Sequence, residues 1–555
     1  MDEKTIWRLI DIYFRENPQA LVRHHIDSYN QFFTKDIFQM FKEMNPLKLD
    51  VDYDDTIQDF RSKCKMYIGG KDASKIYIGK PIIHDPNNIH YMFPNECRLR
   101  NMTYASTIHF DIEIEYERIL RKDDSPTKLD EKGYALVNLD DDDNGQGDGH
   151  LQKKDYTPSE FAEMRENTQN NISGNVQHVK MRLEKIYFGK FPIMLQSELC
   201  VLHKMPRDMR YALGECKNDL GGYFIVDGKE KVVVPQEAFG DNMINVAKAK
   251  DDKYLYTLDI KSVSENVSKP IRTLSLRIIS PTKKFINKQI GVFIPNAGDK
   301  PIPLFIVFRA LGFLTDREII SFCTLQNPEE IPAAFAPFID SCVHDSSSIL
   351  TQYDAIKYIS MFVKGRSITR TYRVLADYFL PHIGEVNFLE KAYYLGYLTN
   401  RLLSVATGIE QPTDRDSYKY KRLSLIGPLL KNLFREYYIQ QQHHIRLSFE
   451  TKYEFGKKTY ADLSTLIYRL YPEIFRKRMV ETGFRKAFKG DWGASAHTKI
   501  VGILQDMNRL SHNGMLDHLR KTNLPMDSSV KLVAPRVLHG SQWGIIDPID
   551  TPDGG

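Results

Sequence analysis

The strongest constraint on the fold is a segment near residue 110 in which apolar and polar residues alternate strictly. In TIHFDIEIEY, Ile108, Phe110, Ile112 and Ile114 alternate with His, Asp and Glu. Successive side chains of an extended strand point to opposite faces, so this pattern predicts a β-strand with one buried face. The chain must therefore supply an apolar layer to cover that side of a sheet.

Two further segments are typical of β-structure. VKMRLEK at 179–185 alternates with basic residues outward, so it could pair with the first strand and set basic beside acidic side chains. GGYFIVDGKEKVVVPQE predicts a hairpin around Asp227-Gly228, residues suited to a turn with positive φ. Short strands are expected from about residue 245 to 295.

Helical spacing of apolar residues recurs along the chain. It predicts an amphipathic helix at 6–14 and further helices within 304–323, 353–363, 388–408, 423–442 and 460–480. The helix within 388–408 is expected to end at Gly408, since glycine is favoured just after a helix. Strands and helices without a repeated βα unit predict an α+β, multidomain chain, and a length of 555 residues suggests about three or four domains.

Composition excludes several classes of protein. Cysteines are spread along the chain with no CxxC pair, which argues against a zinc ribbon or a disulfide framework and favours reduced, mostly buried thiols. The start MDEKTIW has no signal-peptide pattern. The most apolar run, PLFIVFRALGFL, is short and contains Arg309, so no membrane association is expected. The protein is expected to be intracellular and soluble.

An acidic insertion, partly disordered, is predicted at about 121–175. It contains LDDDDNGQGDGH, whose low hydrophobicity favours a solvated loop. Asp140, Asp142 and Asn144 match the start of a calcium-binding loop, but Leu151 occupies the position of the bidentate Glu, so calcium is not expected.

Common catalytic signatures are absent from the sequence, including GxxxxGK[ST], HExxH and GxSxG. The adjacent pairs His24-His25 and His443-His444 are poor metal sites, because neighbouring side chains on a helix diverge.

Positive charge is concentrated in one segment of the chain. Residues 476–536 hold 12 Lys and Arg against 5 Asp and Glu, while the whole chain carries only +4. Such a segment can neutralise phosphates, or it can be a solvated basic surface, and charge does not decide between them.

Longer motifs resemble one family. DRDSYKYKRLSLIGPLL at 414–430 resembles the D-R-D-x-x-x-x-K-R-L-x-x-x-G-P-L-L block of the second-largest, β-like subunit of multisubunit DNA-directed RNA polymerases. SYNQFF, PIMLQSELC, IVFRALGFLTDREI and LDHLRKTNLP also resemble blocks of that family, in its order. The final PRVLHGSQWGIIDPIDTPDGG is similar to its R-x-L-H-x-x-x-W-G-x-x-x-P-x-x-T-P-[ED]-G signature. The pattern is closest to the eukaryotic, archaeal and large-DNA-virus branch, and TPDGG favours a viral version.

The resemblance implies a division into named domains. A protrusion is expected at 1–244 and 383–447, interrupted by a lobe at 245–382. A fork at 448–530 then leads to the start of the external, hybrid-binding region at 531–555. The basic segment is this fork, which in the family borders downstream DNA and the RNA–DNA hybrid, so the resemblance favours nucleic-acid binding there.

It also implies individual site residues. The candidate nucleic-acid contacts are Gln505, Arg509, His518, Arg520, Lys521 and Arg536. Asp553 matches the signature acid near the active centre, where we expect it to orient a neighbouring basic group or amide. The block DRDSYKYKRL has a structural interpretation as an ion-pair network, and nucleic-acid contact is the second interpretation. Its charged members are Asp414, Arg415, Asp416, Lys421 and Arg422.

The implied activity is template-directed RNA synthesis from NTPs, a nucleotidyl transfer assisted by two Mg²⁺ ions. In the family Mg²⁺ is held mainly by the largest subunit, so neither a catalytic residue nor a metal site is expected in this chain. The family's zinc site is expected only downstream of residue 555. The sequence stops inside the signature motif, which leaves a split gene, an intein junction and an incomplete sequence as alternatives, and the polypeptide alone is expected to be inactive.

Partners implied are the largest and smaller polymerase subunits, the DNA template, the RNA–DNA hybrid and NTPs. The compartment would be the host cytoplasm, a virus factory or the virion for a viral protein, and the nucleus for a eukaryotic one. The alternative is a free-standing fragment that binds nucleic acid or polymerase without a catalytic role.

Overall fold

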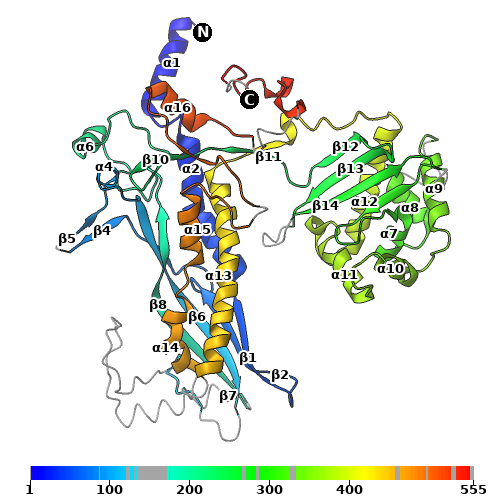
Figure 1. Cartoon of the computed structure of the whole chain (residues 1–555), viewed down its shortest axis with the longest axis horizontal. Helices are drawn as coiled ribbons and strands as arrows, with labels where there is room; N and C mark the ends of the chain where they lie inside the picture. Colours follow the sequence, from blue (N-terminus) through cyan, green and yellow to red (C-terminus); the bar gives the residue numbers. More distant parts are fainter. Residues whose placement is uncertain are drawn as a thin grey trace. The chain divides into compact units, whose positions relative to one another are not determined.

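The computed structural model describes residues 2–86, 88–120, 126–130, 132–135, 172–173, 175–264, 271–282, 287–325, 333–456, 463–495, 498–524, 526 and 533–550. The chain forms two compact units. Unit 1 comprises Met1–Glu237 and Leu423–Pro525, and unit 2 comprises Ala238–Arg422 and Met526–Gly555. Strands and helices occur in both, which confirms the α+β prediction (Figure 1).

A long antiparallel sheet organises unit 1. Its strand order is β1-β2-β6-β8-β7, and β3 also pairs with β6. These strands are β1 (Leu47–Asp54), β2 (Asp59–Ile68), β3 (Ile76–Ile78), β6 (Ala105–Ile119), β7 (Ile172–Ser173) and β8 (Val176–Pro192). The predicted pairing is confirmed: Glu113 lies opposite Arg182, and Glu115 lies opposite Lys180.

Burial along β6 follows the predicted alternation with one exception. Ile108, Phe110, Ile112 and Ile114 are buried, as the pattern requires. Asp111 is buried as well, where the register between β6 and β8 shifts. Its carboxylate accepts hydrogen bonds from the Arg182 guanidinium at 2.6 Å and the Lys185 amide at 2.9 Å. A buried carboxylate is stable here because it is paired and hydrogen-bonded.

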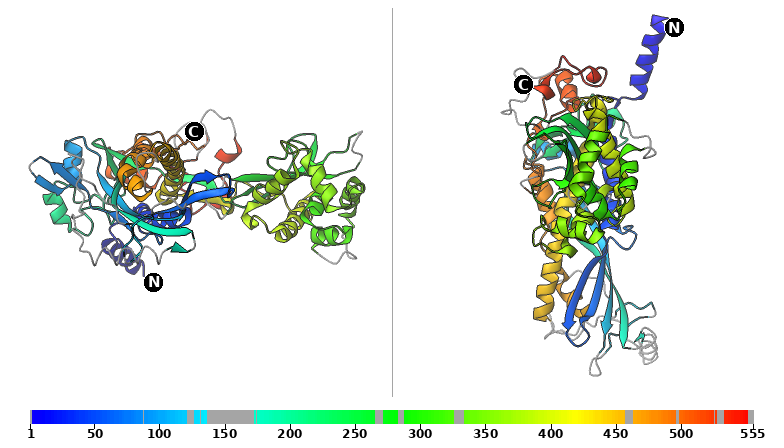
Figure 2. Two further views of the ribbon diagram at one scale, coloured as in Figure 1. Left: turned by 90° about the horizontal axis from the view of Figure 1, so that it is seen from below. Right: turned by 90° about the vertical axis from the view of Figure 1, so that its right-hand side faces the viewer.

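Helices pack on this sheet and supply the apolar layer. Unit 1 contains α1 (Glu3–Glu16), α2 (Arg23–Gln31), the π-helix η1 (Phe32–Asp36), α3 (Ile37–Met44), α4 (Pro94–Leu99), α6 (Arg207–Ala212), α13 (Ile426–Gly456), α14 (Leu463–Ile474), α15 (Met479–Ala487) and α16 (His512–Arg520). The long helix α13 runs along the sheet with α15 beside it (Figures 1 and 2).

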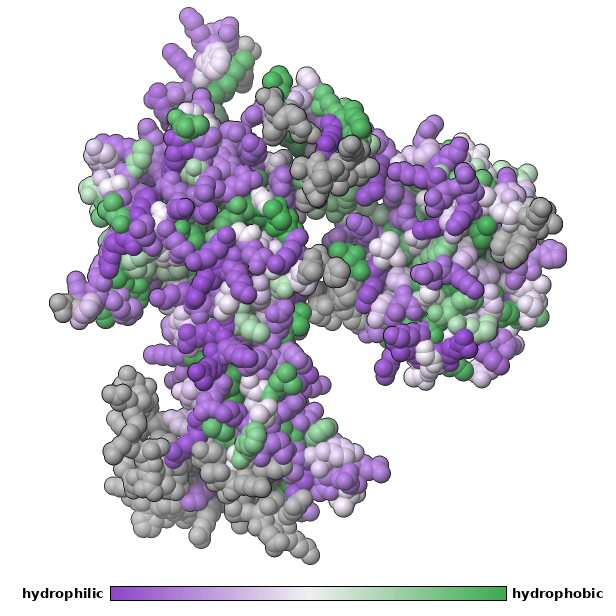
Figure 3. Space-filling view, viewed as in Figure 1, coloured by the Kyte–Doolittle hydropathy of each residue, from purple (hydrophilic) through white to green (hydrophobic). Residues whose placement is uncertain are grey.

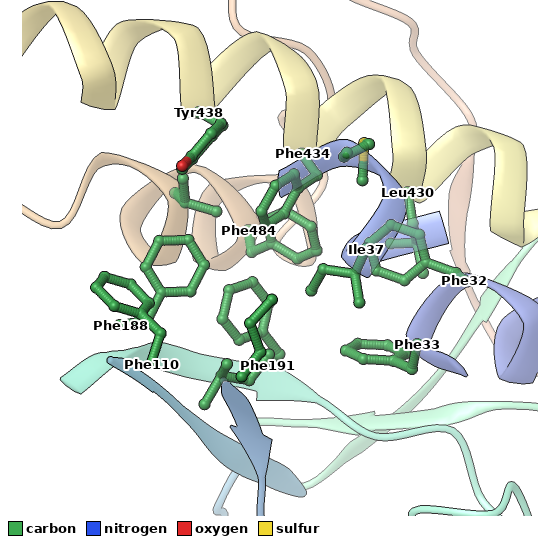
Figure 4. Packing of buried hydrophobic residues seen from close by; sticks show 14 of the residues in the cluster. Phe32, Phe33, Ile37, Phe110, Phe188, Phe191, Leu430, Phe434, Tyr438 and Phe484 are labelled. Carbon is green, nitrogen blue, oxygen red and sulfur yellow. The ribbon is translucent and has the colours of Figure 1, made fainter. Parts of the chain in front are cut away.

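Aromatic rings fill the space between these helices and the sheet (Figure 4). The ring of Phe191 on β8 meets that of Phe484 on α15 at 4.8 Å, edge to face. Phe41 meets Tyr438 of α13 in the same way at 5.0 Å. Such contacts add to the free energy gained by burying the rings. Residues from both sequence segments of unit 1 therefore share one core.

The predicted hairpin is confirmed as β9 (Phe224–Val226) and β10 (Lys229–Val233). Asp227 and Gly228 have φ of 49° and 79°, the left-handed values that a two-residue hairpin turn requires. β18 (Leu504–Asp506) pairs with the other edge of β10. A separate hairpin joins β4 (Ile82–Asp85) to β5 (Asn88–Tyr91).

Unit 2 packs helices against a second antiparallel sheet. The sheet has the order β12-β13-β14-β15-β16, formed by β12 (Ile244–Lys248), β13 (Tyr254–Ser262), β14 (Arg272–Ile279), β15 (Ile290–Phe293) and β16 (Ile302–Pro303). Its helices are α7 (Leu304–Leu311), α8 (Asp316–Thr324), α9 (Ala336–Ser346), α10 (Gln352–Ser360), α11 (Ile368–Asp377) and α12 (Phe388–Ala406), with Gly408 at φ 80° after α12 as predicted. The remaining elements are β11 (Gln236–Phe239), β17 (Lys421–Ser424) and the short 3₁₀ helices η2 (Pro381–Ile383), η3 (Tyr418–Tyr420), η4 (Ala534–Arg536) and η5 (Gly540–Gln542).

The most apolar run of the sequence forms a core helix. Every residue of α7 is buried, including Arg309. The Arg309 guanidinium donates to the carbonyl oxygens of Ser346 at 2.6 Å and Ile349 at 2.5 Å and pairs with Asp316. Over the part of the chain that the structure describes, no helix is both long and apolar enough to cross a bilayer.

Part of the predicted acidic insertion packs in unit 1. Leu129 is fully buried, and the Gln177 amide exchanges hydrogen bonds with the backbone of Thr127 at 3.0 and 2.7 Å. The described residues 126–130 and 132–135 thus belong to the folded unit, whereas LDDDDNGQGDGH, and with it the predicted disorder, lies outside the described residues.

The boundaries of the two compact units differ from those of the predicted domains. Helix α12, expected in the second part of the protrusion, contributes Leu395, Leu398 and Leu402 to the core of unit 2. The segment expected as the fork belongs to unit 1 up to Pro525, and the rest of it is assigned to unit 2. The division into protrusion, lobe, fork and external region stays a prediction.

Candidate nucleic-acid interface

Helix α16 carries three of the predicted contacts, in or just after its last turn. Ser511 begins the helix by accepting a hydrogen bond from the Gly514 amide at 3.0 Å, a typical N-cap. At the other end, the Leu519 carbonyl oxygen accepts a hydrogen bond from His25 Nε2 at 2.6 Å and lies 3.3 Å from His24 Nε2. The histidine pair of α2 therefore satisfies a carbonyl group that would otherwise be unpaired at the helix end.

His25 is buried beneath this contact. Burial and the neighbouring His24 lower the pKa of His25 to about 4, so the ring is neutral at pH 7. The neutral His25 ring donates to a carbonyl oxygen and so has a structural role; that the pair is no metal site stays a prediction.

Gln505 and His518 face each other inside unit 1. His518 is 8% exposed, its Nδ1 accepts from the Asn508 amide at 3.1 Å, and its Nε2 lies 3.1 Å from Gln505 Oε1. Burial lowers the pKa of His518, assisted by the nearby charge of Lys521, and favours the neutral ring. These two predicted contacts join β18 to α16 and position the end of the helix.

Arg520 and Lys521 point into solvent. Arg520 donates to the Leu21 carbonyl oxygen at 2.9 Å, in an exposed position. Lys521 is exposed too. Cations at the last turn of a helix are favoured by its dipole. Arg509 is exposed and basic as well, but it is ion-paired with carboxylates, whereas no ion pair of Arg520 or Lys521 occurs among the described residues.

Arg509 lies in an ion-pair network. Its Nε donates to Glu230 at 2.5 Å, its guanidinium is 3.6 Å from Asp219, and it covers the Tyr223 ring at 5.1 Å. Arg98 binds Glu230 from the other side at 2.8 Å. Arg509 thus joins the loop before α16 to the β9–β10 hairpin. Spacing along the sequence gave no signal for this network, because Arg98, the segment 219–230 and Arg509 are each separated by more than a hundred residues.

The second set of predicted residues lies in unit 2. Asp414 accepts from His539 Nε2 at 2.6 Å, and the Tyr418 amide donates to Ser541 Oγ at 2.9 Å. The hydrogen bond from His539 lowers the pKa of Asp414. The DRD block and the signature motif, over a hundred residues apart, are therefore adjacent in the fold.

The basic residues of the block contact an aromatic ring. The Arg415 guanidinium lies 4.5 Å and the Lys421 ammonium 4.1 Å from the centre of the Phe239 ring, cation–π distances. Arg422 donates to the carbonyl oxygens of Lys419 and Lys421 at 3.0 and 2.8 Å. Asp416 contacts Asp414 through its amide at 3.2 Å. The structural role predicted for this block stays a prediction, and these contacts suit it.

Arg536 is an exposed residue of η4, and Asp553 lies outside the described residues. The described parts hold one group of possible metal ligands, Asp85, His90 and Glu96. The Arg100 guanidinium bridges both carboxylates, at 3.1 Å from Asp85 and 2.7 Å from Glu96. Because a fixed cation already occupies these oxygens, the group does not suit a metal ion.

The structure so far defines a class: an α+β protein of two units in which an exposed basic helix end is held by buried contacts. Comparison with known proteins makes the assignment specific. The sequence profile of the RNA polymerase beta subunit matches residues 20–467, and that of RNA polymerase Rpb2, domain 3, matches residues 505–555. The chain belongs to the RNA polymerase beta subunit family.

Known relatives agree with this family over the whole chain. The chain is 30% identical to DNA-directed RNA polymerase II subunit RPB2 of Encephalitozoon cuniculi, over 99% of this chain and 42% of that protein. It is 28% identical to DNA-directed RNA polymerase II subunit 2 of Arabidopsis thaliana, over 100% of this chain and 42% of that protein. It is 27% identical to DNA-directed RNA polymerase subunit Rpo2N of Methanothermobacter thermautotrophicus, over 99% of this chain and 93% of that protein. The chain thus spans about two fifths of the length of the eukaryotic relatives, and a viral origin stays a prediction.

Proposed function

We propose that the chain is a subunit part of a DNA-directed RNA polymerase and borders the path of the DNA and the RNA–DNA hybrid during template-directed RNA synthesis. The observation that carries the proposal is the family match, which covers residues 20–467 and 505–555 in the order of the family's domains. The relatives quoted above are all subunits of DNA-directed RNA polymerases by name.

Arg520 and Lys521 are the residues we propose to contact nucleic acid. Both are exposed at the end of α16, and that end is held in place by His25 and by the His518–Gln505 contact. A rigid pair of cations can neutralise phosphates without reading sequence. Arg536 joins them as a basic residue of the signature motif, and Asp553 as the acid proposed to orient its neighbours. Arg509, Gln505 and His518 act by positioning α16 and the loop before it.

The remaining chemistry would come from partners. Mg²⁺ would be held mainly by the largest subunit and would assist nucleotidyl transfer from NTPs, and a zinc site would belong to other parts of the complex. The proposed partners are the largest and smaller subunits, the DNA template and the RNA–DNA hybrid. The proposed location is the compartment in which the DNA template is transcribed.

Purification from the natural source tests this proposal. An affinity tag on the chain should co-purify the family's largest subunit, and the eluate should extend RNA on a DNA template when NTPs and Mg²⁺ are added. An eluate that contains the tagged chain without the largest subunit, or that makes no RNA although the largest subunit is present, would contradict it.

A further inference from the structure

A cavity of about 330 Å³ lies in unit 1, and none of its lining residues belongs to α16. The turn of the β9–β10 hairpin, the first residue of β6, the last residues of β8 and helix α15 surround it. Its lining residues are Met92, Asn101, Met102, Thr103, Ala105, Lys190, Pro192, Val226, Asp227, Glu481, Arg485, Phe488 and Lys489. This volume falls in the range of pockets that bind small molecules or anchoring side chains, about 300–1,000 Å³.

The inner wall of the cavity is apolar. Met92, Met102, Pro192 and Val226 line it with aliphatic and thioether groups; Met102 is half-buried and the other three are buried. Methionine adapts to differently shaped ligands. Phe488 is only 1% exposed, so its ring is packed inside the unit and offers no open face. A nucleic-acid base binds most favourably by stacking on an exposed aromatic face. The wall therefore suits an aliphatic or aromatic side chain better than a base.

The two carboxylates at the rim are already engaged. Asp227 pairs with Lys489 at 2.8 Å and accepts from Thr103 at 3.1 Å. Glu481 is buried, and it accepts from the Tyr187 hydroxyl at 3.1 Å and the Lys190 amide at 3.3 Å. Asp227 is thereby paired with a cation, whereas Glu481 is held by neutral donors and lies 3.8 Å from Arg478 and 3.7 Å from Arg485.

Positive charge remains at the rim. The Lys190 side chain is exposed, and its ammonium has no partner among the residues that the structure describes. The Arg485 side chain is 66% exposed, and its guanidinium lies 3.7 Å from Glu481. This distance is long for an ion pair, so most N–H donors of Arg485 stay available. Lys486, the next residue of α15, is exposed as well but does not line the cavity.

We propose that this cavity binds an acidic peptide segment of a partner protein, with one large apolar side chain inserted against the methionines and flanking carboxylates paired with Lys190 and Arg485. The apolar wall would give the anchor its affinity, because buried anchors in pockets dominate binding energies. The cations at the rim would select acidic flanks. The inference does not depend on the proposed role in transcription.

Panning a displayed library of random linear peptides on the full chain tests the proposal. Enriched peptides should share a large apolar residue flanked by Asp or Glu. Their synthetic versions should bind about tenfold more weakly to the double variant Lys190→Glu, Arg485→Glu, and to Ala105→Ile, which fills the cavity without changing charge. Lys486→Glu is the matched control, since it reverses a charge on the same helix outside the cavity, and should retain most of the affinity. Thermal unfolding checks that each variant folds.

Three results would overturn the proposal. One is a set of enriched peptides without the acidic and apolar pattern, and another is binding that Lys486→Glu weakens as much as the cavity variants do. The third comes from an oligothymidylate probe measured by fluorescence anisotropy. If Ala105→Ile removes binding of the oligonucleotide and leaves the peptides unaffected, the cavity binds nucleic acid instead.

Discussion

Arg509 Nε lies 2.5 Å from Glu230 Oε2, and this ion pair joins the loop before α16 to the β9–β10 hairpin. Burial alone would raise the pKa of Glu230, but the hydrogen bond and charge of Arg509, together with Arg98, hold it below its ordinary value. Arg509 therefore stabilises the ionised carboxylate, and its contribution belongs to the stability of unit 1 more than to ligand binding.

We predict that Arg509→Ala lowers the free energy of unfolding by about 1–3 kcal/mol at pH 7, because a largely buried carboxylate loses one of its two cations. A carboxylate with a lowered pKa stabilises the fold above its unfolded pKa and ceases to do so as pH falls through its folded pKa. The difference between Arg509→Ala and the native chain should thus shrink in acid, as urea unfolding at several pH values would show. A constant difference at all pH values would contradict the ion-pair explanation.

His25 should make the stability of unit 1 depend on pH. Its pKa falls from 6.5 to about 4 on folding, so the unfolded chain binds a proton in this interval and the folded chain does not. The contribution of neutral His25 to the free energy of unfolding is therefore fully present above pH 6.5. It falls by about 3 kcal/mol as pH decreases toward 4. His25→Gln keeps a donor for Leu519 and should unfold with a weaker pH dependence over this range. An unchanged pH dependence in the variant would show that other groups are responsible.

Gly427 marks a close approach between α13 and α2. A Cβ atom at this position would lie 2.4 Å from the Ser28 carbonyl oxygen, and the Gly427 amide donates to Ser28 Oγ at 2.9 Å. Gly427→Ala should cost about 1–3 kcal/mol, because backbone on both sides must separate. Gly540→Ala, where no atom lies within 4 Å of the added Cβ, is the control and should leave stability nearly unchanged. Equal unfolding midpoints for the two variants would contradict the close approach.

The contact between Asp414 and His539 can be followed at a single amide. If His539 is replaced by alanine, the segment around Ser541 loses one of its attachments to the DRD block. The Tyr418 amide, which donates to Ser541 Oγ, should then exchange faster with deuterium, while amides of α12 keep their rates. Exchange at Tyr418 that is indifferent to this substitution would mean that the two motifs are held together by other contacts.

Local patterns accounted for much of the fold. The alternation around Ile108 predicted β6 and its buried face, and the charges opposite one another predicted the pairing with β8. Asp227-Gly228 predicted the hairpin turn. These succeeded because strand alternation and left-handed turns are encoded by a few neighbouring residues.

Long-range contacts were not accessible in this way. The helix at residues 6–14 was predicted, but α1 buries none of its side chains, and periodicity alone cannot say whether an apolar face is covered. The break between α7 and α8 at Gly312, with φ 111°, also divided a segment expected to be helical throughout.

In the candidate site too, the sequence predicted which residues matter but not their long-range contacts. Charge and motif resemblance selected Arg520 and Lys521, which are exposed. They selected Gln505 and His518 as well, although these two side chains bind each other and Asn508 inside unit 1. They also selected Arg509, which is partly exposed but ion-paired with Glu230. A sequence motif records that a residue is required, but its burial and partners separate a contact residue from a positioning residue.

The most direct measurement of the central claim is the salt dependence of elongation-complex dissociation in the assembled polymerase. With Arg520→Ala and Lys521→Ala combined, the complex should dissociate faster. The negative slope of log affinity against log salt should become shallower by about two. Lys42→Ala with Lys48→Ala removes the same charge from exposed positions on α3 and β1 and should leave the slope unchanged. Identical slopes for the native enzyme and the Arg520, Lys521 variant would contradict the assignment of this helix end to nucleic-acid binding.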